Sequence, residues 1–398
     1  MPPASRRFYF LGSASLILIS LLIYAGVGDH ELLNWDDRSY TVANPWVTNP
    51  TFQNLLSMFT EVRMGNWHPL TWLSFVPEYA ICGDGALCYK LTNALLHGIN
   101  AFLLGVFVIV LLGLVELRLE LPAATLQLIR SSRAGLSFSQ WVGLLSSLLF
   151  LAHPQHVEAV TWVAERKELL CGLFYLSALI VYCRGYEWSY WRRNGAVLTL
   201  FILALMSKSM AVSLPLALVL LDVFLLHHQK LLREKDAAFA FSTLVIQKLP
   251  YFLLMFGAML LTVISQTPGR LQPVALDEKL FTVLAGLQHY PLKFLLPVGF
   301  SPFYPQELVY SGMIGYLPLL IFAGGTAFVF YKCRGSWSLP LLLLALLFYL
   351  VAVAPVIGIV KVGEQAFADR YSYLPTIGFY LIAGWCLAWL AFRVSRLV

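Results

Sequence analysis

The feature that most constrains this chain is a series of long apolar runs with few charges inside them. Of the 398 residues, 59% are hydrophobic and 12% are charged, and the mean hydropathy is +0.74. Because about 20 consecutive apolar residues cross a bilayer as a helix, this composition excludes a water-soluble enzyme and a nucleic-acid binder that relies on a basic surface. The runs cover residues 8–26, 89–113, 138–153, 167–184, 195–227, 243–266, 313–331, 338–358 and 375–393.

One of these runs is too long for a single helix. The run 195–227 is interrupted by Ser207, Lys208 and Ser209, and a charged residue in the middle of a bilayer is costly. We therefore predict a tight helical hairpin that places Lys208 near the membrane face. The chain is then an all-α polytopic membrane protein, a single domain over residues 1–398 with about 10–11 helices, of which ten span the membrane.

Lys and Arg are enriched in alternate loops, which sets the orientation of the bundle. With the N-terminus inside, the shorter inner loops and their edges carry fifteen of the 27 cations. Residues 27–88 then form the first and longest outer loop. The stretch 281–298 is also apolar, but the segment 289–293 (HYPLK) and then Pro297 interrupt the apolar run. We expect it to be a re-entrant or interfacial helix on the outer face.

The outer loop 27–88 mixes aromatic residues with turn formers, which predicts short helices lying on the bilayer surface. Asp36 and Asp37 are adjacent in this loop. Two like charges so close raise the pKa of one carboxyl, as a general base working near neutral pH requires. A solvated Asx-type turn that caps a surface helix is the alternative, and spacing alone favours that turn.

A second polar cluster follows the third apolar run and contains His153, His156 and Glu158. His156 and Glu158 would not share one face of a helix. A His-x-x-His pair binds metals, but a third ligand at suitable spacing is missing, so structural histidines are favoured over a metal site. Arg166 and Lys167 lie on the outer face, against the positive-inside trend, which indicates an anionic partner such as a phosphate.

A third cluster precedes the last run and contains Asp369, Arg370, Tyr371 and Tyr373. The predicted topology places Arg370 and Lys208 on the outer side as well. Ordinary loop solvation and snorkelling explain any one of these cations, and for Lys208 alone that alternative is strong. Three separate loops that bring acids and cations to the same face favour a shared site.

The six cysteines divide between two environments. Four lie in or beside the apolar runs, where a small apolar thiol is expected. Cys82 and Cys88 fall in the outer loop, where thiols oxidise in an extracytoplasmic compartment. Their spacing leaves a disulfide open.

Six segments carry a family resemblance, and they run in family order over nearly the whole chain. Through these segments and their order, the chain resembles the bacterial relatives of the transmembrane and tetratricopeptide-repeat O-mannosyltransferase family. The members of this family are membrane glycosyltransferases of the GT-C class. The resemblance implies a GT-C-type bundle with a long first outer loop. Family members usually carry C-terminal tetratricopeptide repeats, and we find none in this sequence. The segments are 34–37 (NWDD), 66–74 (NWHPLTWLS), 91–97 (LTNALLH), 153–160 (HPQHVEAV), 163–168 (VAERKE) and 368–375 (ADRYSYLP).

The resemblance implies a transferase on the outer face of a bacterial inner membrane. It would move mannose or another hexose from a polyprenyl-phosphate donor to a Ser or Thr hydroxyl of a secreted or envelope protein. Membrane lipids would surround it, and nucleic acid is not an expected partner. The first acid of the outer pair is the usual base of this class, which carries over to Asp36, with Asp37 beside it.

The remaining site residues follow from the same chemistry. The leaving group is an ionised lipid phosphate, which needs cations rather than a general acid, and the expected product is inverted at the anomeric carbon. The phosphate-binding candidates are Arg166, Lys167, Lys208 and Arg370. The side chains expected to orient sugar or acceptor are His68, His153, His156, Glu158, Asp369, Tyr371 and Tyr373.

Four further points were weighed from the sequence: a metal ion and three alternative functions. Outer carboxylates suit Mg²⁺ or Mn²⁺ as hard oxygen ligands, but no metal site is identified. Another lipid-linked glycan transferase or ligase, acting on a glycan or lipid acceptor, shares the donor and the membrane face. A secondary transporter is disfavoured, because internal repeats are not found and the ionisable residues gather at the outer ends of the spans, apart from Asp222. A purely structural scaffold has no need for an outward acidic pair.

Overall fold

In the part of the chain that the structure describes, eleven helices have at least 15 residues, and ten of them, one for each predicted span, form the body of the molecule. The computed structural model describes residues 3–118, 123–185, 188–228, 246–270, 276–305, 317–334, 338–358 and 365–394. Three of its helices are long and apolar enough to cross a bilayer by themselves, over residues 86–117, 249–266 and 339–356. The ten are α1 (Pro3–Ile23), α6 (Ala86–Arg118), α8 (Phe138–Ala152), α10 (Arg166–Arg184), α11 (Tyr190–Ser207), α12 (Leu214–His228), α14 (Leu249–Arg270), α16 (Leu317–Cys333), α17 (Ser338–Val353) and α18 (Ile377–Val394).

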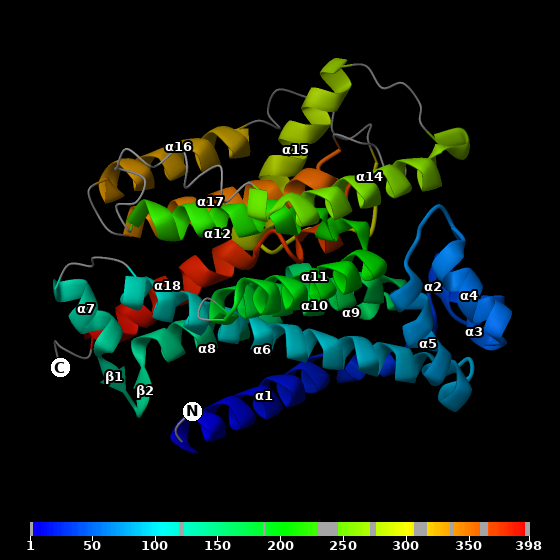
Figure 1. Cartoon of the computed structure of the whole chain (residues 1–398), viewed down its shortest axis with the longest axis horizontal. Helices are drawn as coiled ribbons and strands as arrows, with labels where there is room; N and C mark the ends of the chain where they lie inside the picture. Colours follow the sequence, from blue (N-terminus) through cyan, green and yellow to red (C-terminus); the bar gives the residue numbers. More distant parts are fainter. Residues whose placement is uncertain are drawn as a thin grey trace.

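These helices run roughly along the long axis of the molecule, and the loops separate to its two ends (Figure 1). Both termini lie towards one end, together with α7 (Ala123–Arg130) and a short hairpin of β1 (Ser132–Arg133) and β2 (Leu136–Ser137). The loop 27–88 lies at the other end, as the predicted topology requires. Residues 229–242 of the inner loops lie outside the described residues. The helices of loop 27–88 are α2 (Asp37–Tyr40), α3 (Pro45–Thr48), α4 (Phe52–Thr60) and α5 (Pro69–Cys82).

Local signals set the ends of the helices that lead to the outer end. Helix α8 begins with a capping box, in which Ser137 Oγ accepts from the Gln140 N–H at 3.3 Å and Gln140 Oε1 accepts from the Ser137 N–H at 2.8 Å. It ends just ahead of Pro154, which cannot continue the hydrogen-bond ladder. Helix α11 ends where Lys208 adopts an extended backbone. The predicted break in the run 195–227 is therefore confirmed.

Most of the stretch 281–298 belongs to one helix, α15 (Leu276–Leu295), which continues through Pro291. A proline inside a helix leaves the carbonyl four residues earlier without its donor. Here that carbonyl belongs to Leu287, and the Tyr349 hydroxyl donates to it at 2.7 Å. The helix ends ahead of Pro297 instead. It stands steeply across the direction of the ten long helices (Figure 1), and its re-entrant or interfacial placement stays a prediction.

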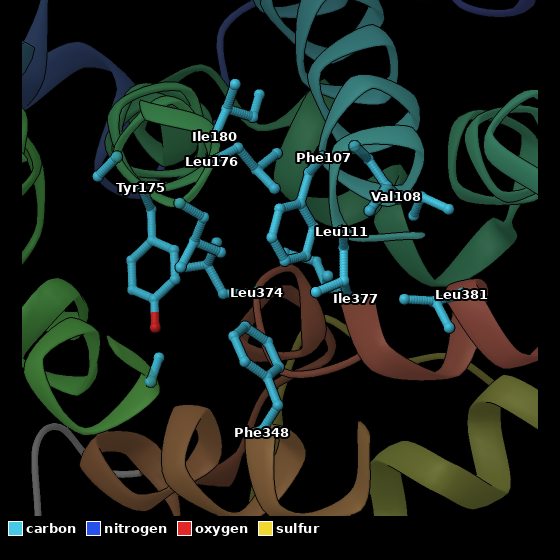
Figure 2. Packing of buried hydrophobic residues seen from close by; sticks show 14 of the residues in the cluster. Phe107, Val108, Leu111, Tyr175, Leu176, Ile180, Phe348, Leu374, Ile377 and Leu381 are labelled. Carbon is cyan, nitrogen blue, oxygen red and sulfur yellow. The ribbon is translucent and has the colours of Figure 1, made fainter. Parts of the chain in front are cut away.

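Glycines allow the closest approach between the central helices. A Cβ on Gly105 of α6 would lie 2.3 Å from the Ser147 Oγ of α8, and a Cβ on Gly384 of α18 would lie 2.2 Å from the Ser146 Oγ. Small residues let helix backbones approach in a bilayer, where the lipid gives no hydrophobic drive for association. Side chains from α6, α10, α17 and α18 fill the apolar layer shown in Figure 2, among them Phe107, Leu111, Leu176, Phe348 and Ile377.

A second apolar cluster attaches the outer loop to the bundle. Trp72 and Phe75 of α5 are fully buried in it. The Cys82–Cys88 disulfide joins the end of α5 to the start of α6, so the pairing that the sequence left open is formed. Because α5 is fixed at both ends, the loop 27–88 is held as a cap over one end of the bundle. Other members of the cluster are Tyr40, Trp46, Met58, Tyr89 and Trp162.

Candidate active site

The two adjacent aspartates of the outer loop have different environments. Asp37 is fully buried, and its carboxylate accepts from the Ala164 N–H at 2.8 Å and from the Leu33 N–H at 2.9 Å. Burial raises the pKa of Asp37, and these backbone donors oppose the shift. The hydrogen bond from the Ala164 N–H ties the loop 27–88 to residues 163–165. Asp37 therefore has the contacts of a structural residue.

Asp36 is half-buried, and its carboxylate makes no hydrogen bond or salt bridge with any residue that the structure describes. It lies within electrostatic range of Lys167 and Tyr40. A carboxylate that is partly shielded from water but has no committed partner is free to accept a proton from an incoming group. Of the predicted acidic pair, only Asp36 has this geometry.

Three cations from three separate segments meet at the carboxylate of Glu165. Its Oε1 lies 3.0 Å from Lys167 Nζ and 3.1 Å from Arg370 Nε, and its Oε2 lies 3.4 Å from Lys208 Nζ. Glu165 itself is 1% exposed. Burial alone would raise the pKa of Glu165, but the three cations outweigh that effect and hold the pKa well below its ordinary value. We call Glu165, Lys167, Lys208 and Arg370 the cation cluster.

Two further carboxylates complete the ion pairs of this cluster. Glu158 Oε1 lies 2.5 Å from Arg370 Nη1, and its Oε2 accepts from the Arg370 N–H at 2.8 Å. Glu168 Oε2 lies 2.9 Å from Lys208 Nζ. Burial raises the pKa of Glu158 to about 7, against the opposing effect of Arg370. The cation cluster and these two partners together contain three cations and three carboxylates, and the pKa of one of these carboxylates, Glu158, lies near neutral pH.

Aromatic rings form the walls around these cations. Lys167 Nζ lies 4.9 Å from the ring centre of Tyr40, and Lys208 Nζ lies 5.2 Å from that of Tyr371. The Arg370 guanidinium lies 4.8 Å from the Trp162 ring and 5.0 Å from the Tyr371 ring. Such contacts stabilise a cation in addition to its ion pairs, so the three cations are held by carboxylates and by aromatic rings together.

Arg166 is the predicted cation that the structure does not bring into the cluster. Its guanidinium points to the other side of α10, where Nε donates to Asn93 Oδ1 at 2.9 Å and Nη2 donates to the Tyr89 carbonyl at 2.8 Å. It also forms a salt bridge with Glu78 of α5 and covers the Phe75 ring. Successive residues on a helix point in different directions, so Arg166 joins α5, α6 and α10 while Lys167 faces the site.

The histidines of the prediction separate into two groups. His68 lies beside the cluster, with its Nδ1 3.5 Å from the Tyr40 hydroxyl, and burial together with Lys167 and Lys208 lowers its pKa well below the ordinary value. His153 caps the turn at residues 154–156 through its Nδ1 and lies 3.1 Å from the Phe294 carbonyl through its Nε2. His156 packs among aromatic rings, with Phe150 centred 4.4 Å away. Only His68 adjoins the cation cluster.

Asp369, Tyr371 and Tyr373 are close together in the sequence, but their side chains contact different parts of the structure. Asp369 accepts from His289 Nε2 at 2.8 Å and from the Tyr304 hydroxyl at 2.8 Å, which joins α15 to the pair β3 (Tyr304–Pro305) and β4 (Gln365–Phe367). Tyr373 is buried deep in the bundle against Asn100. Tyr371 alone of the three borders the cations.

Sequence reasoning assigned no role to Glu165, Glu168, Tyr40 or Trp162. The signal for the two glutamates was present, because both stand in the segment 163–168 that contains Lys167. Cations placed on an outer face with acids one and two residues away predict internal ion pairs as well as an anion site. Within the described residues, no group of three His, Cys, Asp or Glu side chains is arranged to hold a metal ion.

Comparison with known proteins finds similarity to several protein O-mannosyl-transferases. Over 235 residues the chain is 30% identical to the protein O-mannosyl-transferase Tmtc2 of Drosophila melanogaster, and the match covers 55% of this chain and 22% of the relative. It is 26% identical over 359 residues to TMTC3 of Homo sapiens, covering 80% of this chain and 36% of the relative. A 124-residue match to human TMTC4 is 32% identical and covers 31% of this chain and 15% of the relative.

Over 31% to 80% of its length, the chain is similar to these three TMTC protein O-mannosyl-transferases. It spans between 15% and 36% of the length of these three relatives. No family model matches it, and no solved structure does. The resemblance inferred from the six sequence segments is therefore confirmed by independent matches to several TMTC proteins.

Proposed function

We propose that this protein is a glycosyltransferase that moves a hexose, mannose above all, from a polyprenyl-phosphate donor to a Ser or Thr hydroxyl of a protein. The single observation that carries the proposal is an uncommitted carboxylate, Asp36, within electrostatic range of Lys167, which is one of three buried cations that meet at Glu165. The relatives' names as protein O-mannosyl-transferases supply the substrate class. The reaction needs a base that removes the proton of the acceptor hydroxyl and cations that receive the leaving phosphate. Asp36 supplies the base in this proposal, and the three cations receive the phosphate.

Asp36 acts as the general base. The acceptor hydroxyl must lose its proton as its oxygen attacks the anomeric carbon, because its pKa lies far above neutral. The C–O bond to the donor phosphate breaks as the new C–O bond forms, and the proton goes to the Asp36 carboxylate. Attack from the face opposite the leaving phosphate gives the inverted product. Asp37 fixes the backbone beside Asp36 through the Ala164 N–H.

Lys167, Lys208 and Arg370 receive the leaving phosphate. A polyprenyl phosphate leaves as an anion, and fixed cations at that point lower the barrier. The ion pairs with Glu165 do not exhaust their donors, because an ammonium has three N–H groups and a guanidinium has five. Glu165 thereby keeps the three cations close together, against their mutual repulsion, until the phosphate binds.

We further propose that the site faces the exterior of a bacterial inner membrane, where a secreted or envelope protein supplies the acceptor. The Cys82–Cys88 disulfide supports this orientation, because disulfides persist in oxidising compartments. The low density of Lys and Arg in the loops at this end supports it as well.

The test is transfer of labelled mannose from mannosyl phosphopolyprenol to an acceptor protein by the purified full chain. Asp36→Asn should lower kcat by about 10²–10⁴-fold, as removal of a general base does, with little change in donor binding. Asp29→Asn is the matched control, since Asp29 is an exposed carboxylate of the same loop. Full activity of Asp36→Asn would remove Asp36 from this role. Transfer to a glycan or lipid but to no protein would replace the acceptor class, and an EDTA arm tests dependence on Mg²⁺ or Mn²⁺.

A further inference from the structure

One face of α6 carries four buried polar side chains, Lys90, Asn93, His97 and Asn100, which are at most 4% exposed. Their spacing of three, four and three residues places them on the same side of the helix. Polar and ionisable side chains are rare inside a membrane helix and mark functional positions when they occur. Two of the four lie in the segment 91–97, which carries the family resemblance but has no role in the proposed function. We call the four side chains the polar stripe of α6.

Lys90 holds the segment that leads to Asp36. Its ammonium donates to the carbonyls of Val27 at 3.1 Å, His30 at 2.6 Å and Glu31 at 3.1 Å. An ammonium has three N–H groups, so Lys90 uses all of its donors on this one segment at the start of the outer loop. Asp36 follows five residues after the last of these carbonyls. The position of its carboxylate therefore depends on where Lys90 fixes the chain.

Asn93, on the next turn of the stripe, holds a different segment. Its Nδ2 donates to the carbonyls of Val160 at 3.2 Å and Trp162 at 3.3 Å. Its Oδ1 accepts from Arg166 Nε at 2.9 Å. Two members of the cation cluster belong to the stretch 160–167. Asn93 therefore fixes the backbone on which these two members lie.

His97 and Asn100 hold the third segment through the Tyr373 hydroxyl. His97 Nε2 lies 3.2 Å from the Leu151 carbonyl, which can only accept, so Nε2 carries a proton and donates it. In the neutral ring, Nδ1 then accepts from the Tyr373 hydroxyl at 2.9 Å, and this hydroxyl accepts from Asn100 Nδ2 at 3.0 Å. Tyr373 follows three residues after Arg370 of the cation cluster, so the same stripe also fixes the third segment of the site.

We propose that the polar stripe of α6 sets the position of the base relative to the phosphate-binding cations, an inference that rests on the proposed function. The start of α6 lies at the same end of the molecule as the outer-loop helices (Figure 1). One helix holds the three segments there, in addition to the contacts that the segments make with one another. A misplacement of about 1 Å between reacting groups costs about 100-fold in rate. The four side chains are therefore positioning residues of the reaction.

Two substitutions in the purified full chain separate the parts of the stripe. Lys90→Met removes the ammonium and keeps an apolar stem, so it releases the segment of Asp36 alone. The kcat for mannose transfer should fall about tenfold to hundredfold, and the Kd of polyprenyl phosphate should stay unchanged. Asn93→Leu releases the segment of Lys167 instead, so it should raise that Kd about tenfold.

Hydrogen–deuterium exchange gives a readout that does not depend on transfer. Backbone amides of residues 27–41 should exchange faster in Lys90→Met, and those of residues 160–168 should exchange faster in Asn93→Leu. Thr92→Val is the matched control, because Thr92 lies between the two positions on α6 and its side chain makes no hydrogen bond within the described residues. It should change none of these quantities. If Lys90→Met does not fold, Lys90→Arg replaces it, since it keeps the charge but changes the geometry of the donors.

The outcomes separate the inference from the proposed function. A normal kcat in the Lys90 variant, or the same loss of kcat and of polyprenyl phosphate binding in the Lys90 and Asn93 variants, would overturn the inference. Unchanged exchange in both segments would overturn it as well. The expected changes in exchange and in binding, with no transfer by the wild type, would support the stripe and count against the proposed function alone.

Discussion

Replacing Glu165 by Gln removes the one negative charge that Lys167, Lys208 and Arg370 share, and it keeps the size of the side chain. The charge is buried, with its oxygens 3.0, 3.1 and 3.4 Å from the three cations. In the variant these cations face one another with less compensation. Their mutual repulsion then opposes folding, whereas any bound anion relieves it.

The structure sets the size of the effect. Removing one partner of a buried ion pair costs about 3–5 kcal/mol. Lys208 and Arg370 each keep a second carboxylate, at 2.9 and 2.5 Å, whereas Lys167 loses its only salt bridge within the described residues. The lower end of the range therefore applies, and we expect Glu165→Gln to lower the free energy of unfolding by about 3 kcal/mol.

Unfolding of the full chain in detergent, with and without polyprenyl phosphate, measures both sides of this expectation. The lipid should stabilise Glu165→Gln more than the wild type, because the uncovered cations bind phosphate more tightly and ligand binding adds to stability. Glu116→Gln is the control, since the Glu116–Arg130 pair, at 2.8 Å, is solvent-exposed and contributes less than about 1 kcal/mol. A variant as stable as the wild type, or one that gains nothing extra from the lipid, would refute the reasoning.

Three further predictions concern single interactions. The Glu158 pKa of about 7 exceeds its unfolded value of 4.5, so the contribution of this carboxyl to stability is complete below about pH 4.5 and is lost as pH rises through 7. The free energy of unfolding of the wild type should therefore fall as pH rises through this range, whereas that of Glu158→Gln should lack this decrease. Replacing Cys82 and Cys88 by Ser should lower the free energy of unfolding by about 2 kcal/mol, and after reduction both wild-type thiols should react with an impermeant maleimide added outside intact cells. Arg166→Ala should cost about 3–5 kcal/mol in unfolding experiments, with Arg166→Lys recovering only part, because Lys lacks the planar fork.

The transmembrane arrangement was predictable because the bilayer leaves few alternatives. Backbone groups in hydrocarbon must be satisfied within a helix, so apolar runs and the break at Lys208 were enough to locate the helices. Pro291 shows where this logic stops. The helix continues through it because Tyr349, 58 positions away, donates to the freed carbonyl. A tertiary contact of that kind is not visible in the local sequence.

The site was predictable as a set of segments but not residue by residue. Asp36 and Asp37 are neighbours of the same type, and only the Ala164 N–H, 127 positions away, makes Asp37 structural and leaves Asp36 uncommitted. Arg166 and Lys167 are likewise adjacent cations that a helix start turns in different directions. Which of two neighbours faces a site depends on the exact residue at which the helix begins, and helix boundaries are the least reliable part of a prediction from sequence.

Under the proposed function, the arrangement around Glu165 also explains how a membrane protein can hold a phosphate site ready before its ligand binds. Three cations brought close together in a dry environment would repel one another and lose hydration. Glu165, which contacts all three, offsets both costs together with Glu158 and Glu168. The aromatic rings of Tyr40, Trp162 and Tyr371 add to this without using the donors. The positions of the cations are thereby fixed in the resting protein. In the proposed reaction, no further reorganisation energy is then needed when charge develops on the leaving phosphate. A site built on flexible, solvated lysines would have to assemble that field during the reaction itself.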